Sequence, residues 1–226
     1  RCRLIDLLVD GLGRRASLRG KQMSAHGDLP INHQTEGTSL GVPTIKLTWW
    51  TFLSSECMFF GSLLATYFSL KPNRVTPEPL PIEMFDLDLT TVSTFVLLAS
   101  SFLMVLAVNA ATEGNGKQTR LWLLATAFFG CIFIGFQAYE FTEFYAKGLT
   151  LESGTFGSSF FTLTGFHGFH VCIGIIWILS LWALSFTGWL GPERALTVEI
   201  CGLYWHFVDI VWIVIFTIVY LVEFVP

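Results

Sequence analysis

The chain has 226 residues, of which 53% are hydrophobic and only 13% are charged, and its formal net charge is −4. Soluble domains usually carry about 25% charged residues, so this composition excludes an ordinary soluble protein and indicates a polytopic membrane protein. No dense basic patch follows the first 21 residues, which argues against nucleic-acid binding.

Residues 1–46 are polar and contain no apolar run long enough to cross a bilayer. We therefore expect an extramembrane lead-in at 1–46, followed by a membrane domain at 47–226. A signal peptide is not expected, because the short apolar stretch is interrupted by Asp6 and Asp10. The chain starts without Met, and basic residues precede Met23. Residues 1–22 are therefore a candidate for a processed or misassigned start, absent from the mature protein.

Five apolar segments follow the lead-in, and each is long enough to cross a hydrocarbon core of about 30 Å as a helix. Their approximate ranges are 47–70, 89–111, 121–145, 157–187 and 198–225. Helices satisfy their own backbone hydrogen bonds, as a bilayer core requires. The intervening segments are rich in Pro, Gly and charged residues, a composition typical of loops. The sequence thus predicts an all-α membrane protein, a bundle of five transmembrane helices.

The distribution of Lys and Arg predicts the orientation. With a cytoplasmic N-terminus, the cytoplasmic side holds ten basic residues and the other side three; without residues 1–22 the numbers are four and three. We therefore expect the N-terminus in the cytoplasm and the C-terminus outside.

Cysteine usage predicts neither disulfides nor a zinc site. Four of the five cysteines lie singly in separate apolar segments, and no CxxC pair is present. We expect them to act as small buried apolar fillers.

Glu56 is the only charged residue between Lys46 and Lys71, and it lies well inside the first apolar segment. An ionisable group at this depth is costly and marks a functional site by default. One interpretation is an acid that exchanges protons or binds a lipid headgroup. The alternative is a protonated Glu56 satisfied by a neighbouring Ser, Trp or backbone group.

His167 and His170 share one face of the fourth segment, and Glu140 lies near the outer end of the third. Two imidazoles on one helix cannot sandwich a haem, and the Glu-x-x-His pairs of di-iron bundles are absent. We therefore expect the two histidines to hydrogen-bond between helices, and we expect Glu140 to bond to another helix or to have a functional role. Gly165, Gly168 and Gly174 in the fourth segment predict close helix packing.

His206 and Asp209 lie three residues apart in the last segment, so they can touch each other or one common partner. No nucleophile, phosphate loop or cofactor motif accompanies them, and Ser158 and Ser159 lack the G-x-S-x-G pattern. The sequence therefore predicts a polar clasp that fixes the packing of the last helix, with no catalytic residues and no metal ligands.

Four motifs in order carry a family resemblance: Ser54–Phe60, Gln137–Phe141, Thr164–Val171 and Tyr204–Trp212. They resemble S-E-x-M-F-F, Q-A-x-E-[YF], T-G-F-H-G-L-H-V and Y-W-H-F-V-D-x-V-W. Together they cover about residues 47–225, and on them the chain resembles cytochrome c oxidase subunit III.

The resemblance implies a subunit that binds no haem or copper itself, these groups lying in partner subunits. It would contact subunit I directly, and subunit II and a small subunit IV in the same complex. It would also support proton uptake, protect the complex during turnover and bind structural phospholipid. Glu56 would correspond to the family's carbodiimide-reactive carboxyl, and His206 to a polar packing or lipid-contact position.

The mitochondrial form has seven helices, so a five-helix chain resembles the bacterial form and implies a bacterial plasma membrane. Glu56, Trp205 and the sequence Phe207–Asp209 favour the cytochrome c branch of the family. A quinol oxidase subunit III and a nitric-oxide-reductase-associated homologue are the alternatives.

Two alternatives come from other classes of protein. A proton-coupled membrane transporter would use Glu56 and Asp209 as relay groups, but no pair of Gly/Pro-interrupted segments in inverted repeats is visible. An intramembrane enzyme would need a nucleophile near His167 or His206, and the sequence shows none nearby along the chain.

Overall fold

A computed structural model describes residues 42–70, 86–188 and 190–221. The chain divides into two units, residues 1–48 and residues 49–226. The expectations for residues 1–22, for most of the lead-in and for most of the proline-rich connection at 71–88 lie outside the described residues. The second unit contains all the polar clusters considered below.

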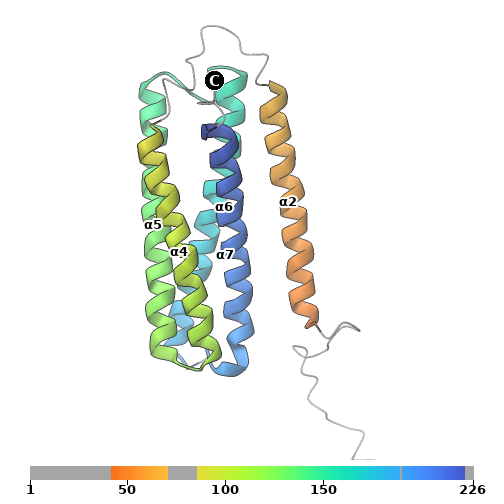
Figure 1. The fold of residues 1–226 in the computed structure, drawn as a ribbon, viewed down its shortest axis with the longest axis vertical. Coiled ribbons are helices and arrows are strands. Elements are labelled where there is room, and N and C mark those ends of the chain that lie inside the picture. The colour runs from red at the N-terminus through yellow and green to blue at the C-terminus, as the bar shows by residue number, and fades with distance from the viewer. Residues whose placement is uncertain (1–41, 71–85, 189, 222–226) are drawn as a thin grey trace, which may run out of the picture. The chain divides into compact units, whose positions relative to one another are not determined.

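Five long α-helices account for most of the described residues. They are α2 (Thr44–Leu70), α4 (Leu87–Thr112), α5 (Gly116–Ala146), α6 (Thr155–Ser185) and α7 (Ala195–Ile215). A short 3₁₀ turn, η3 (Pro192–Arg194), precedes α7, and a π-helical segment, η4 (Phe216–Leu221), continues it. Figure 1 shows α4, α5, α6 and α7 running lengthwise beside one another.

Four of these helices are long and apolar enough to cross a membrane: α4, α5, α6 and α7 together with η4. The fifth, α2, has 27 residues, which gives about 40 Å of length. By composition it is not among the four. The predicted five helices are therefore all present, and four of them also have the composition of a span.

Glycine and asparagine make the tight turn between α4 and α5. Gly114 has a positive φ of 71°, and its N–H donates to the Ala111 carbonyl. The next N–H, from Asn115, donates to the Ala110 carbonyl, which completes a Schellman motif. The Asn115 side chain then accepts from the Gln118 N–H and caps α5. This turn makes α4 and α5 antiparallel neighbours.

Hydroxyl groups of α4 join it to α7 across the bundle. The pairs are Trp205 Nε1 with Ser100 Oγ (3.0 Å), His206 Nδ1 with Ser101 Oγ (2.6 Å) and Trp212 Nε1 with Thr94 Oγ1 (2.9 Å). Between His206 and Trp212 the residue number rises on α7, while that of the partner on α4 falls from Ser101 to Thr94, so the two helices are antiparallel. These contacts fix the register between the second and the last predicted spans.

Aromatic rings join α2 to α6. The ring pairs, with centroid distances, are Trp49–Trp177 (4.9 Å), Phe59–Phe166 (5.3 Å), Phe60–His170 (5.1 Å) and Tyr67–Phe156 (6.0 Å). Their order shows that α2 and α6 are antiparallel. These ring pairs hold the face of α2 that carries Glu56 against α6.

Two packing predictions need correction. An added Cβ at Gly174 would lie 2.8 Å from Trp205 and one at Gly168 2.7 Å from Gln137, but nothing lies within 4 Å at Gly165. Gly165 is therefore not a close-packing position. Among the cysteines in the described residues, only Cys201 is buried, while Cys57 and Cys131 are exposed. Apolar sequence does not separate core positions from the outer surface of a membrane protein, where apolar residues are also favoured.

Candidate functional site

Glu56 and His170 form the polar contact between α2 and α6. The Glu56 Oε2 atom lies 3.4 Å from His170 Nε2, and both side chains are mostly buried, with 20% and 13% exposed. Glu56 is twelve residues after Thr44, about 18 Å along the helix. Its partner is therefore an imidazole, rather than the Ser, Trp or backbone group considered from the sequence.

The other ring nitrogen of His170 bonds to the backbone of its own helix. His170 Nδ1 lies 2.7 Å from the Phe166 carbonyl oxygen, which can only accept, so Nδ1 carries a proton. The Nε2 atom is therefore the ring nitrogen that faces Glu56.

His167 has a different environment, although it lies one turn away on the same helix. Its side chain is fully buried and stacks on Trp212, with centroids 5.0 Å apart and planes at 26°. Neither ring nitrogen has a hydrogen-bond partner among the described groups. The prediction that both histidines hydrogen-bond between helices is therefore wrong for His167, whose ring is packed among other rings. His170 faces Glu56 of α2.

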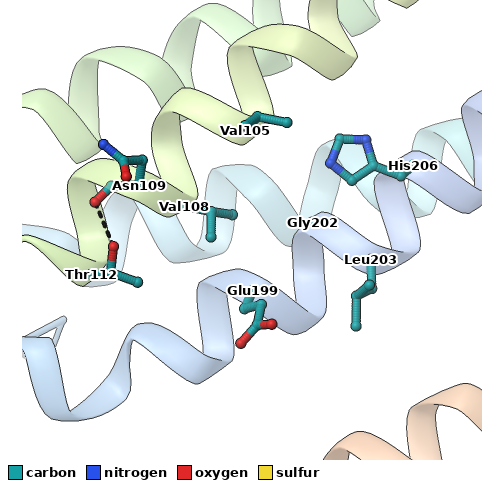
Figure 2. A pocket seen from close by; sticks show the side chains of 8 residues that line it. All are labelled: Val105, Val108, Asn109, Thr112, Glu199, Gly202, Leu203 and His206. Carbon is teal, nitrogen blue, oxygen red and sulfur yellow. Dashed lines mark hydrogen bonds between the residues drawn. The ribbon is translucent and has the colours of Figure 1, made fainter.

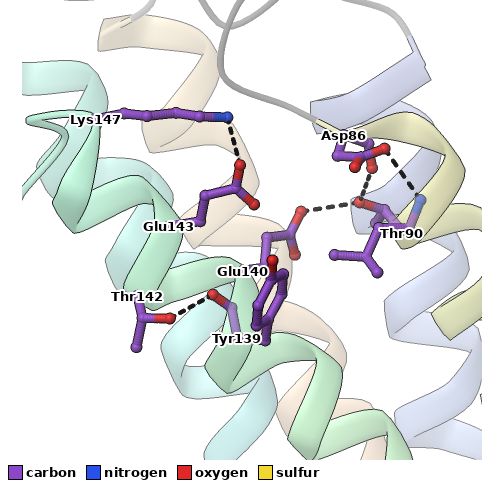
Figure 3. Close-up of polar contacts among 8 residues, drawn as sticks. Asp86, Thr90, Tyr139, Glu140, Thr142, Glu143 and Lys147 are labelled. Carbon is purple, nitrogen blue, oxygen red and sulfur yellow. Dashed lines mark hydrogen bonds and ion pairs between the residues drawn. The ribbon is translucent and has the colours of Figure 1, made fainter.

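Glu140 lies at the meeting of three helical elements (Figure 3). Only 5% of the residue is exposed. Its Oε1 lies 2.9 Å from the Thr90 hydroxyl of α4, and its Oε2 lies 3.3 Å from the Tyr220 hydroxyl of η4. Glu143, one turn further along α5, pairs instead with Lys147 at 2.9 Å.

The hydrogen-bond donors available around Glu140 indicate which of its protonation states gives every contact in this cluster a hydrogen bond. The Thr90 hydroxyl is also 2.9 Å from the Asp86 carbonyl oxygen, and one O–H cannot fill both contacts. If Glu140 is protonated, it donates to Thr90, Thr90 donates to Asp86, and Tyr220 donates to Glu140. All three contacts are then satisfied by one carboxyl proton, as a neutral buried acid requires.

His206 and Asp209 meet at a common partner, the Ser101 hydroxyl of α4. Ser101 Oγ lies 2.6 Å from His206 Nδ1, and the Ser101 side chain also interacts with the Asp209 carboxyl. Asp209 is 5% exposed, and its Oδ1 atom has no partner among the described groups. The structure thus brings together His206 and Asp209, while Glu56 with His170 and Glu140 with Thr90 form separate clusters.

The hydroxyl partners of these groups were not predicted from the sequence. The residues concerned are Thr90, Thr94, Ser100, Ser101 and Tyr220. A signal was present, because the segment that became α4 is unusually rich in Ser and Thr for an apolar span. Interhelical hydrogen bonds from such residues are a common way to join membrane helices.

Each cluster contains a carboxyl group beside a side chain of another helix that can donate or accept a hydrogen bond. Within the described part of the chain, no group of three or more His, Cys, Asp or Glu residues has an arrangement that could hold a metal ion.

The helical bundle and the four ordered motifs agree with the result of a family comparison. Residues 20–223 match the family model for cytochrome c oxidase subunit III, which is most of the chain. The chain therefore belongs to the subunit III family of haem-copper oxidases, and it is a subunit of a multi-subunit membrane oxidase.

Individual relatives agree with this assignment. The chain is 39% identical over 198 residues to quinol oxidase subunit 3 of Bacillus subtilis, with 87% of this chain and 95% of that protein covered. It is 38% identical over 180 residues to the probable quinol oxidase subunit 3 of Staphylococcus saprophyticus, with 80% and 90% covered. The quinol oxidase subunit 3 of Bacillus spizizenii is similar at 39% identity over 198 residues.

Proposed function

We propose that this chain is subunit III of a quinol-oxidising haem-copper terminal oxidase. The observation that carries the proposal is its similarity to quinol oxidase subunits along almost their whole length. Glu56 and Phe207–Asp209 favoured the cytochrome c branch, but they are a few positions, whereas the similarity extends over at least four-fifths of the chain. The quinol alternative is therefore preferred.

Within the complex, we propose a supporting role without redox chemistry in this chain. Several ionisable groups inside the bundle contact other helices of this chain: Glu56 contacts His170, Glu140 contacts Thr90, and His206 contacts Ser101. Haem and copper would lie in partner subunits, with subunit I in direct contact and subunits II and IV in the same assembly. Support of proton uptake and phospholipid binding are part of this proposal.

The outer faces of α4 and α5 are suited to contact lipid or a partner subunit. Phe95 and Phe102 on α4 and Phe128 on α5 are each more than 60% exposed. Large apolar side chains are stable on such a surface only when lipid or another apolar surface covers it. We propose that this chain lies in a bacterial plasma membrane, with its N-terminus in the cytoplasm and its C-terminus outside.

The electron donor and the partners are tested together by purifying the complex through a tag on this chain. Native membranes are solubilised gently, and the product is analysed for haem, copper and subunit composition. Oxygen consumption is then measured with a reduced quinol and, separately, with reduced cytochrome c.

We expect haem and copper to co-purify and quinol, but not cytochrome c, to support oxygen consumption. If cytochrome c supported oxygen consumption and quinol did not, the chain would belong to the cytochrome c branch that Glu56 and Phe207–Asp209 favour. Absence of haem and copper from a purified chain that retains its other partners would contradict membership of the terminal oxidase.

A further inference from the structure

A pocket between α4 and α7 leads from one end of the bundle towards its middle (Figure 2). Its volume is about 300 Å³, enough for several water molecules. Near the helix ends it is lined by Asn109, Thr112 and Glu199, and deeper along α7 it is lined by His206. His206 is seven residues beyond Glu199, about 10 Å further along the helix.

The deep end of the pocket is continuous with the hydrogen bond between His206 and Ser101. His206 Nδ1 lies 2.6 Å from Ser101 Oγ, and the Ser101 side chain also interacts with the Asp209 carboxyl. Asp209 does not line the pocket and is 95% buried, yet its Oδ1 atom has no partner among the described groups. A buried carboxyl with an unused oxygen therefore lies one helical turn from the imidazole that lines the pocket.

Neighbouring contacts hold the two helices at the distance that the His206–Ser101 bond requires. Trp205 Nε1 donates to Ser100 Oγ at 3.0 Å, and Trp212 Nε1 donates to Thr94 Oγ1 at 2.9 Å. The first bond is adjacent to the Ser101–His206 contact, and the second lies six residues further along α7. Ser101 is consequently held against His206 by fixed helix packing.

We propose that Asp209 is a proton-exchange site, served from the aqueous phase by water in this pocket, then by His206 and Ser101. In one state, His206 Nδ1–H donates to Ser101, and the Ser101 hydroxyl donates to the Asp209 carboxylate. A water-borne proton binds at His206 Nε2, the Nδ1 proton moves to Ser101 Oγ, and the Ser101 proton moves to Asp209.

In the second state, Asp209 donates to Ser101, and Ser101 donates to the now unprotonated Nδ1. His206 is neutral in both states, with its proton on Nδ1 in the first and on Nε2 in the second. One proton has entered and no bond between heavy atoms has changed. A hydroxyl can serve both states because it donates one hydrogen bond while it accepts another. The proposal concerns this chain's own residues and does not depend on which electron donor the complex uses.

The first test asks whether water enters the pocket, in the intact complex in membrane vesicles. Val105→Cys places a thiol in the pocket, seven residues before the end of α4. Leu124→Cys is the matched control, eight residues after the start of α5 and outside this pocket. The two native residues are 50% and 43% exposed.

Both thiols are exposed to a charged, membrane-impermeant methanethiosulfonate from each side of the membrane in turn. Each variant is compared with the unmodified chain to correct for its native cysteines. We expect the thiol at position 105 to react at least about tenfold faster than the thiol at 124, because thiolate forms only in contact with water. Equal rates from both sides would overturn the water-filled pocket.

The second test follows exchange at Asp209 directly. The purified complex is transferred to D₂O, and the shift of the carboxylic C=O stretching band is followed by infrared spectroscopy. Asp209→Asn identifies the band by its loss. Ser101→Ala removes the hydroxyl relay, and Ser101→Thr retains a hydroxyl. Ser180→Ala is the control, because Ser180 is exposed and bonds only to its own helix at the Ile176 carbonyl.

We expect Ser101→Ala to slow exchange at least about tenfold, the factor for losing roughly one hydrogen bond from the path. Ser101→Thr and Ser180→Ala should exchange at the original rate. Unchanged exchange in Ser101→Ala, or absence of any band that Asp209→Asn removes, would overturn the proposal. If Ser101→Ala fails to assemble, the test rests on Ser101→Thr, which keeps the hydroxyl. Slow exchange in that variant would then overturn the proposal.

Discussion

At the scale of single residues, the carboxyls inside the bundle lie against side chains of other helices. Glu56 faces His170, Glu140 faces Thr90 and Tyr220, and Asp209 reaches Ser101. A buried polar group without a hydrogen bond is costly, and in a bilayer no water replaces a lost partner. The partners therefore decide which substitutions the fold tolerates.

The first prediction concerns the reactivity of Glu56. Glu56→Gln keeps the side-chain shape and supplies an amide N–H that can donate to His170 Nε2, so haem spectra of the purified complex should be unchanged. Labelling of this chain by a lipophilic carbodiimide, measured by mass spectrometry, should be lost because the reagent needs a carboxyl. Glu152→Gln, an exposed acid in the turn between α5 and α6, is the control and should retain labelling. Unchanged labelling in Glu56→Gln would show that another acid reacts.

The second prediction concerns the Glu140 cluster. Thr90→Val removes the hydroxyl that bonds to Glu140 and should lower stability by about 1 kcal/mol, a usual effect of one interhelical bond in a membrane protein. The measurement is the midpoint of thermal unfolding of the solubilised complex. Thr142→Val is the control on α5, because its exposed hydroxyl bonds only to the Tyr139 carbonyl. An equal loss from both variants would mean that the Glu140 contact adds nothing.

At the scale of helices, α7 is the element that joins the others. It shares hydroxyl–indole bonds with α4, and its Trp205 ring fills the space left by Gly130 of α5 and Gly174 of α6. Trp205 is 1% exposed. Its indole N–H has a partner in Ser100, so the large ring is buried without an unpaired donor. Small residues on two helices thus form the space that one large residue of a third helix occupies.

The third prediction follows from this packing. Gly174→Ala would place a Cβ 2.8 Å from Trp205 and should destabilise the complex by roughly 1–3 kcal/mol through overpacking. Gly165→Ala on the same helix is the control, since nothing lies within 4 Å of its Cβ, and it should have little effect. The midpoints of thermal unfolding of the two variants are measured in the same detergent and compared. A neutral Gly174→Ala would mean that Trp205 moves without cost.

At the scale of the whole molecule, the helices place two short turns at opposite ends of the bundle. The turn at Glu113–Asn115 follows α4, and the turn that includes Lys147 and Gly148 follows α5. Because α5 is one of the helices able to span a membrane, these turns face opposite sides of it. Lys117 and Arg120 lie just after the first turn, and Lys147 lies in the second.

The fourth prediction is the orientation of the chain. If basic residues favour the cytoplasm, a cysteine that replaces Asn115 should react with an impermeant reagent only in inverted vesicles. A cysteine that replaces Glu152 in the second turn should react only in right-side-out vesicles. The two positions control for one another, and the reverse pattern would place the N-terminus outside.

Hydropathy and motifs along the chain were enough to predict the class of protein, the helices and the family. Long apolar segments must be helical in a bilayer, and the motifs of Ser54–Phe60 and Tyr204–Trp212 can be recognised without knowledge of contacts. The partners of the polar groups could be assigned only from the packing of the helices: Ser101 and His206 are 105 residues apart, and His170 meets Glu56 while His167 does not. Helical periodicity assigns a residue to a face but does not say which helix that face meets, because hydrogen bonds across a bundle depend on helix register and order.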